Sequence, residues 1–118
     1  MNEVFKKNKW DILIKKLEEK FQMPIDYAGI LFLIGLQELG KPYRKYNKDE
    51  KLAIMHIAVC TLLEPYGIYE YIGKDKDGWP HWRLVEELPP LSDVQQNKLI
   101  TEAIIDYFEK QNFFDEIK

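Results

Sequence analysis

The sequence predicts an α+β domain of four helices, with one antiparallel β-hairpin between the third and the fourth helix. Three observations support this fold class. Apolar residues recur at three- and four-residue steps over most of the chain, the step changes to two from Ile68, and proline and glycine separate these segments. With 118 residues, the chain has the length of one ordinary domain, so residues 1–118 are predicted to form a single domain.

The first two helices are predicted from their apolar patterns and from the residues that flank them. Asn8 has the character of an N-cap, and the helix after it carries an apolar stripe of Trp10, Leu13, Ile14, Leu17 and Phe21. A second helix is predicted over 27–39, because Gly40 follows where a C-terminal glycine is expected. Its apolar residues surround it almost completely, so we expect neighbours on several sides, with Gly29 and Gly35 allowing one of them to approach closely.

Two capping boxes predict where the third and fourth helices begin. Asn47 and Glu50 have this spacing before a helix over 48–63, and Ser92 and Gln95 have it before the last helix. The inward stripe of the last helix, and the apolar tail that we expect to pack after it, consist of Ile100, Ala103, Ile104, Tyr107, Phe108, Phe113 and Phe114.

The hairpin is predicted from alternation on both sides of a polar turn. One strand begins at Ile68, the turn covers 73–78, and the second strand covers 79–85. Since Pro80 has no amide hydrogen, the second strand should be an edge at that point. A lone two-stranded hairpin is marginal in water, so we expect one of its faces to lie on helices.

Composition favours a globular protein of the cytoplasm. Hydrophobic residues make up 46% and charged residues 31%, with a net charge of -3. A single cysteine cannot form an internal disulfide, and residues 1–11 are polar and Lys-rich, unlike a signal peptide. The longest uncharged stretch, 27–37, is far short of the ~20 residues that a membrane helix needs, so no membrane partner is predicted.

Catalytic signatures are scarce, so the sequence predicts no enzyme, no cofactor and no metal. There are one Ser, two Thr, one Cys and two His, and the only serine, Ser92, is already assigned to a helix cap. The sequence contains no glycine-rich phosphate loop and no His-Glu-x-x-His motif. The turn residues Asp75, Asp77 and Gly78 resemble part of a calcium loop, but the twelfth ligand position would be Leu84, so a charged hairpin tip is the simpler interpretation.

One row of ligand-type side chains leaves an alternative open. His56, Cys60 and Glu64 follow one another at four-residue steps, which aligns them along one side of the third helix. His81 from the hairpin is a conceivable fourth group of a metal or thiol site. The competing interpretation is that Cys60 is a small buried residue under the hairpin and that His56 lies at its rim.

Charge is unevenly distributed, which suggests nucleic-acid binding as an alternative function. Residues 1–51 hold 11 basic and 8 acidic side chains, and residues 52–118 hold 6 and 12. Three helices followed by a hairpin also suggest a winged-helix-like domain, although the third helix offers few polar side chains to reach base edges. The candidate residues, interleaved with Tyr43 and Tyr46, are Lys41, Arg44, Lys45, Lys48 and Lys51.

Aromatic residues are densest around the predicted hairpin. Large rings on both of its faces would leave some of them at the surface, where Tyr and Trp dominate binding hot spots. Packing of rings on a pleated sheet is the competing explanation. The leading hypothesis is a small protein-interaction module that binds a protein partner or its own copy, as a homo-oligomer, through the hairpin face and edge; the candidate residues are Tyr69, Tyr71, Trp79, Trp82 and Arg83.

Overall fold

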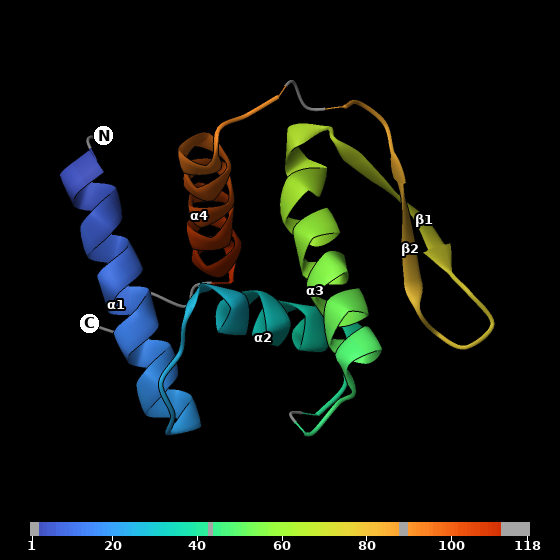
Figure 1. The fold of residues 1–118 in the computed structure, drawn as a ribbon, viewed down its shortest axis with the longest axis horizontal. Coiled ribbons are helices and arrows are strands. Elements are labelled where there is room, and N and C mark those ends of the chain that lie inside the picture. The colour runs from blue at the N-terminus through green and yellow to red at the C-terminus, as the bar shows by residue number, and fades with distance from the viewer. Residues whose placement is uncertain (1–2, 43, 88–89, 112–118) are drawn as a thin grey trace. The chain divides into compact units, whose positions relative to one another are not determined.

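A computed structural model of the chain describes residues 3–42, 44–87 and 90–111, and the side chains among them from residue 9 onward. The predicted fold class is confirmed: the described residues form four helices, with an antiparallel hairpin between the third and the fourth (Figure 1). The elements are α1 (Glu3–Phe21), α2 (Tyr27–Leu39), α3 (Lys48–Leu63), the 3-10 turn η1 (Glu64–Tyr66), β1 (Tyr69–Lys74), β2 (Pro80–Leu84) and α4 (Asp93–Lys110).

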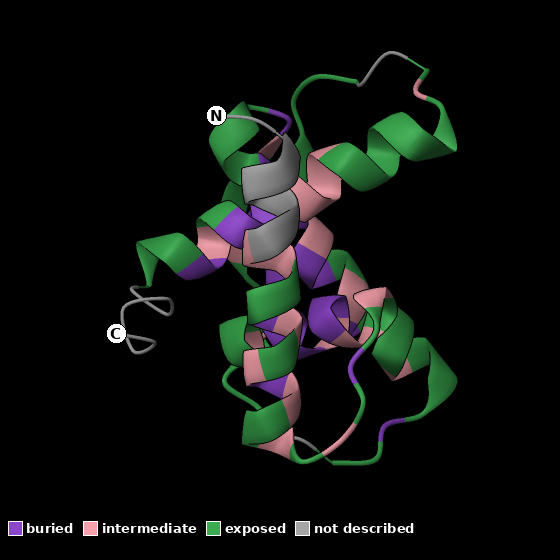
Figure 2. Cartoon of the chain, turned by 90° about the vertical axis from the view of Figure 1, so that its left-hand side faces the viewer, coloured by how far each residue is buried: buried purple, intermediate pink, exposed green. Residues whose placement is uncertain are grey.

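The chain divides into two compact units, each described below by itself. Unit 1 comprises Met1–Asp26 and Leu91–Lys118, and unit 2 comprises Tyr27–Pro90. Figure 2 shows buried, intermediate and exposed residues following one another along the same helices, as expected for helices covered on one side. That the whole chain is a single domain stays a prediction.

Unit 1 contains α1 and α4, which are joined by an ion pair between Lys9 and Glu109. Leu13 and Leu17 of the predicted α1 stripe are buried. The prediction that Asn8 caps this helix is wrong, because α1 already begins at Glu3. No proline or glycine interrupts residues 3–8, so the helix extends beyond the stripe from which it was predicted.

The fourth helix begins where the sequence predicts. Ser92 accepts a hydrogen bond from the backbone N–H of Gln95, and the Gln95 side chain accepts one from the N–H of Ser92, which completes the capping box. Ala103, Ile104 and Phe108 of the predicted stripe are buried, and Ile105 is buried as well. The expected packing of Phe113 and Phe114 lies outside the described residues.

Unit 2 is organised around the contact between α2 and α3, whose bounds match the predicted ranges. The expected close approach is confirmed at Gly35, where an added Cβ would lie 2.1 Å from the carbonyl oxygen of Ile54. Beside this contact, buried residues from both helices and the loop between them form a cluster with partly buried neighbours. This cluster, the foot cluster, consists of Leu36, Tyr46, Ile54, Phe32, Leu39 and Trp79.

Local signals end α2 and begin α3. Gly40 has a φ of 69°, and the N–H of Lys41 donates to the carbonyl of Leu36, so the glycine closes the helix in a left-handed conformation. At the next helix, Asn47 and Glu50 form both hydrogen bonds of the predicted capping box. Because both ends are fixed by neighbouring residues, the sequence alone was sufficient to place them.

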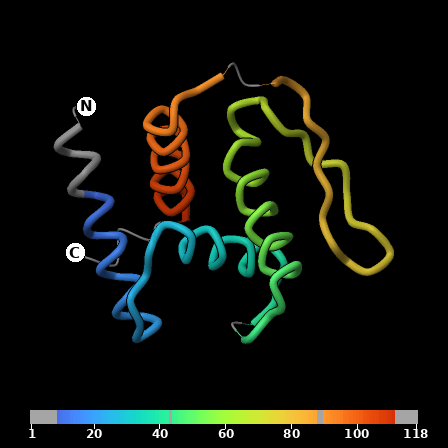
Figure 3. Tube along the Cα trace, viewed as in Figure 1, coloured from blue at the N-terminus to red at the C-terminus, as the bar shows by residue number. Residues whose placement is uncertain are grey.

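The hairpin runs alongside α3 and returns (Figure 3), and each strand contacts that helix. Tyr69 pairs with Leu84 and Tyr71 with Trp82, but Gly73 pairs with His81, which leaves Ile72 as an extra residue in β1. Since the sheet within the described residues has only these two strands, Pro80 lies in an edge strand, as predicted. The bulge at Ile72 was not expected from the alternation of the sequence.

Candidate functional site

Four hairpin side chains lie on one face, which we call the aromatic face: Tyr69, Tyr71, Trp82 and Leu84. The register places each tyrosine directly opposite one of the other two residues, and side chains opposite one another share a face. The rings of Tyr71 and Trp82 meet edge to face with centroids 5.4 Å apart, which agrees with this register. Glu70 and Arg83 pair on the opposite face.

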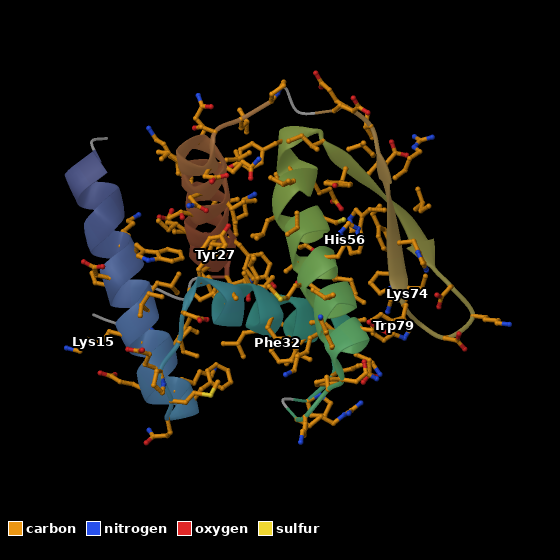
Figure 4. All side chains as sticks on the ribbon, viewed as in Figure 1. Lys15, Tyr27, Phe32, His56, Lys74 and Trp79 are labelled. Carbon is orange, nitrogen blue, oxygen red and sulfur yellow. The ribbon has the colours of Figure 1, made fainter. Side chains whose placement is uncertain are left out.

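The aromatic face contacts α3 and the turn that follows it. The ring of Tyr69 lies edge-on to the imidazole of His56, with 6.3 Å between centroids (Figure 4 labels His56). The indole N–H of Trp82 donates to a Glu64 carboxylate oxygen at 2.9 Å. Tyr69 and Trp82 are therefore half-buried anchors that hold the hairpin in place, as well as candidate contact residues.

The outer part of the hairpin remains open to solvent. Tyr71 is 45% exposed and Leu84 is 48% exposed, even though both belong to the aromatic face. Ile72 at the bulge is 60% exposed, and Val85 after β2 is 53% exposed. The sequence prediction included Tyr71 but missed the three aliphatic residues. Their residue type could have indicated this exposure. A single helix cannot cover apolar side chains on both faces of a hairpin, so some of them have to remain at the surface.

Two predicted site residues occupy other surroundings. Trp79 precedes β2 and packs with the foot cluster (Figure 4). Its ring is therefore in contact with the helical part of unit 2, and that both hairpin faces carry large rings stays a prediction. Arg83 forms an ion pair with Glu70 at 3.0 Å on the opposite face, where both side chains are exposed.

The row of ligand-type residues on α3 is divided among separate contacts. His56 Nε2 lies 3.5 Å from Cys60 Sγ, whereas Glu64 binds Trp82. His81 Nε2 lies 2.8 Å from Asp75 Oδ2, so this imidazole is engaged at the hairpin tip. Burial raises the pKa of the Cys60 thiol to about 11, the opposite of what a nucleophilic thiol needs. Within the described residues, no group of three or more His, Cys, Asp and Glu side chains is arranged to hold a metal ion.

Asp75 organises the hairpin tip that resembled a calcium loop. Its Oδ1 accepts hydrogen bonds from the backbone N–H groups of Asp77 and Trp79, at 2.9 and 3.0 Å. The hydrogen bond from the His81 side chain, followed by the one from the Trp79 backbone, holds the pKa of Asp75 below its ordinary value. This carboxylate is therefore engaged within the turn itself.

The nucleic-acid candidates lie next to the foot cluster. We call these five residues the basic segment: Lys41, Arg44, Lys45, Lys48 and Lys51. All five are exposed. The ammonium of Lys41 lies 5.7 Å from the ring centre of Trp79, and the guanidinium of Arg44 lies 3.9 Å from that of Tyr46. Tyr43 lies outside the described residues, so its expected place among these cations is not described.

No helix in the described part of the chain is long and apolar enough to cross a membrane. Comparison with protein-family models, with curated proteins and with solved structures finds no match for this chain.

Proposed function

We propose that this chain is a non-catalytic protein-interaction module that binds a protein partner through its hairpin. The observation that carries the proposal is the group of exposed apolar side chains, which we call the hairpin surface: Tyr71, Ile72, Leu84 and Val85. Each of the four exposes between 45% and 60% of its area, although they lie within one short hairpin. Surface apolar residues that gather in one place mark interaction sites more often than scattered ones do.

The surroundings of this surface also favour a protein partner. Tyr71 is held by its edge-to-face contact with Trp82, and Trp82 is fixed by its hydrogen bond to Glu64. A ring that is already positioned loses little conformational freedom when a partner covers it. On the opposite face of the hairpin, Arg83 and Glu70 form an exposed ion pair, so the apolar side chains of the hairpin surface have charged neighbours in the sequence.

The test replaces apolar contact residues without touching the anchors on α3. The variant Tyr71→Ser, Ile72→Ser should lose at least 90% of the partner that the wild-type chain captures from a lysate of its own cells, as quantified by mass spectrometry. The matched control is Ile12→Ser, Val94→Ser, since those two residues of unit 1 are 43% and 76% exposed. Circular dichroism establishes that both variants are folded.

Self-association is tested with the same variants. Light scattering after size-exclusion chromatography at increasing concentration reports whether the partner is a second copy, and the hairpin variant should then remain monomeric. If the hairpin variant captures the same proteins and forms the same oligomers as the control, this surface is not the binding site.

A further inference from the structure

The basic segment is a second surface, independent of the hairpin surface. Its five cations lie within residues 41–51 of a chain whose net charge is -3. Among the described residues, no carboxylate lies within 4.0 Å of the charged nitrogens of any of them. Elsewhere Lys9 and Arg83 do have carboxylate partners, whereas the cations of the basic segment are not held in ion pairs of this kind among the described residues.

The acidic residues within 41–51 offset only part of this charge, because the segment holds five cations and two carboxylates. Glu50 is the third residue of α3, and its carboxylate accepts a hydrogen bond from the backbone N–H of Asn47 in the capping box. Asp49 is exposed beside it. Carboxylates in the first turn favourably face the positive end of the helix dipole, so both have a structural role at the helix end.

The loop that carries the cations is held against the foot cluster. Tyr46 is 4% exposed, its hydroxyl donates to the carbonyl of Pro42 at 2.8 Å, and its ring meets that of Phe32 edge to face. Arg44 lies over the same tyrosine ring. Because the ring supports one face of the guanidinium and one nitrogen donates to the Lys45 carbonyl, the side chain is positioned with further N–H donors to offer.

Aromatic surface lies directly beside these donors. Trp79 is only partly buried, and Lys41 lies over its ring. Lys48 and Lys51 are three residues apart on α3, so they project from one side of its first turns, with Cβ atoms about 5–6 Å apart. Cations that follow a backbone, together with an accessible ring, are the combination by which proteins hold single-stranded nucleic acid.

We propose that the basic segment binds the phosphodiester backbone of single-stranded nucleic acid. Backbone contacts do not require polar side chains at base edges, so the apolar character of α3 beyond Leu52 does not oppose this binding. A ring supplies stacking for a base of any kind, and sequence preference should therefore be weak.

The test measures binding of a fluorescent 20-nucleotide oligothymidine to the full chain by anisotropy at increasing salt. If all five cations contact phosphates, the logarithm of the affinity falls against the logarithm of salt with a slope of about -3.5. Between about 50 and 200 mM salt the affinity should then fall about 100-fold.

Two variants with the same change in net charge separate the segment from the rest of the chain. The triple variant Lys45→Gln, Lys48→Gln, Lys51→Gln leaves the two cations that lie over rings unchanged. With two contacts left, its slope should be about -1.4, and its affinity should fall only about 7-fold over the same salt range. The matched control changes three cations of α1: Lys15→Gln, Lys16→Gln and Lys20→Gln.

Three results would overturn the inference. One is the absence of oligothymidine binding by the wild-type chain at 50 mM salt, and another is an equal loss in the triple variant and the control. The third is competition by polyglutamate of matched charge as effectively as by unlabelled oligothymidine, because the surface would then recognise acidic protein segments. The Tyr71→Ser, Ile72→Ser variant should bind the oligonucleotide normally, which separates this surface from the hairpin surface.

Discussion

Replacing Gly35 with alanine tests the close approach of α2 and α3 that organises unit 2. A Cβ at this position would lie 2.1 Å from the Ile54 carbonyl oxygen, whereas ordinary contacts begin at 3.4 Å. The two atoms must therefore separate by about 1.3 Å. Because the oxygen belongs to the backbone of α3, no side-chain rotation relieves the overlap, and the helices themselves have to move apart.

The expected cost follows from two opposing effects. Overpacking of this kind costs about 1–3 kcal/mol, and a clash with backbone belongs at the upper end of that range. Alanine has a higher helix propensity than glycine, and inside a helix this raises the free energy of unfolding by up to about 1 kcal/mol. Gly35→Ala should therefore lower the free energy of unfolding by about 2 kcal/mol.

Urea unfolding followed by tryptophan fluorescence measures this change, because Trp79 lies in the foot cluster with Ile54. Ala28→Gly is the control, because Ala28 is exposed in the same helix. This substitution should change helix propensity alone and lower the free energy of unfolding by up to about 1 kcal/mol. If Gly35→Ala leaves stability unchanged or raises it, helix propensity decides the outcome and the two helices do not meet as described.

Three further predictions concern α3 and the hairpin that lies on it. Trp82→Phe should lower the free energy of unfolding by about 1 kcal/mol in urea titrations, because it removes the donor to Glu64. With a pKa of about 11 instead of 9.0, native Cys60 should carry about 100-fold less thiolate at pH 8 and react that much more slowly with a disulfide reagent. Since its hydrogen bond with His81 lowers the pKa of Asp75, the hairpin tip should keep its structure as pH falls to 3.8 and lose this support only below that value, as followed by NMR.

Each of these has its own control. Glu64→Gln retains an acceptor oxygen for Trp82 and should cost less than Trp82→Phe; an equal or larger cost would contradict the assigned hydrogen bond. In urea, the Cys60 thiol should react as fast as a free thiol, and stability should decline as pH rises from 9.0 towards 11, because the unfolded thiol ionises first. Asp75→Asn should remove the acid transition at the tip, and persistence of that transition would assign it to another group.

The helix boundaries that the sequence predicts best are those set by neighbouring residues. Gly40 closes α2, while Asn47 and Ser92 open α3 and α4 through capping boxes that need only residues three positions away. Asn8 misled the prediction because a cap-forming residue also occurs inside helices, and nothing in its neighbourhood stops α1 from beginning at Glu3. Local signals identify allowed helix starts without stating which of them is used.

The hairpin surface depends on contacts that alternation cannot supply. The bulge at Ile72 arises from cross-strand pairing, and a single extra residue changes which side chains face outward. Trp79 packs on a cluster formed by residues more than 20 positions away in the sequence. Tyr71 was predicted from its residue type, but the 48% exposure of Leu84 depends on tertiary packing that the sequence pattern does not state.

The extra residue in β1 also limits unwanted growth of the sheet. A short sheet with two free edges and apolar side chains at its surface is the kind of template on which chains stack into fibrils. Here one strand contains an irregular position and the other starts with Pro80, which has no N–H to offer a newcomer. The hairpin can thus expose apolar side chains to water, while neither of its edge strands favours pairing with further copies of the chain.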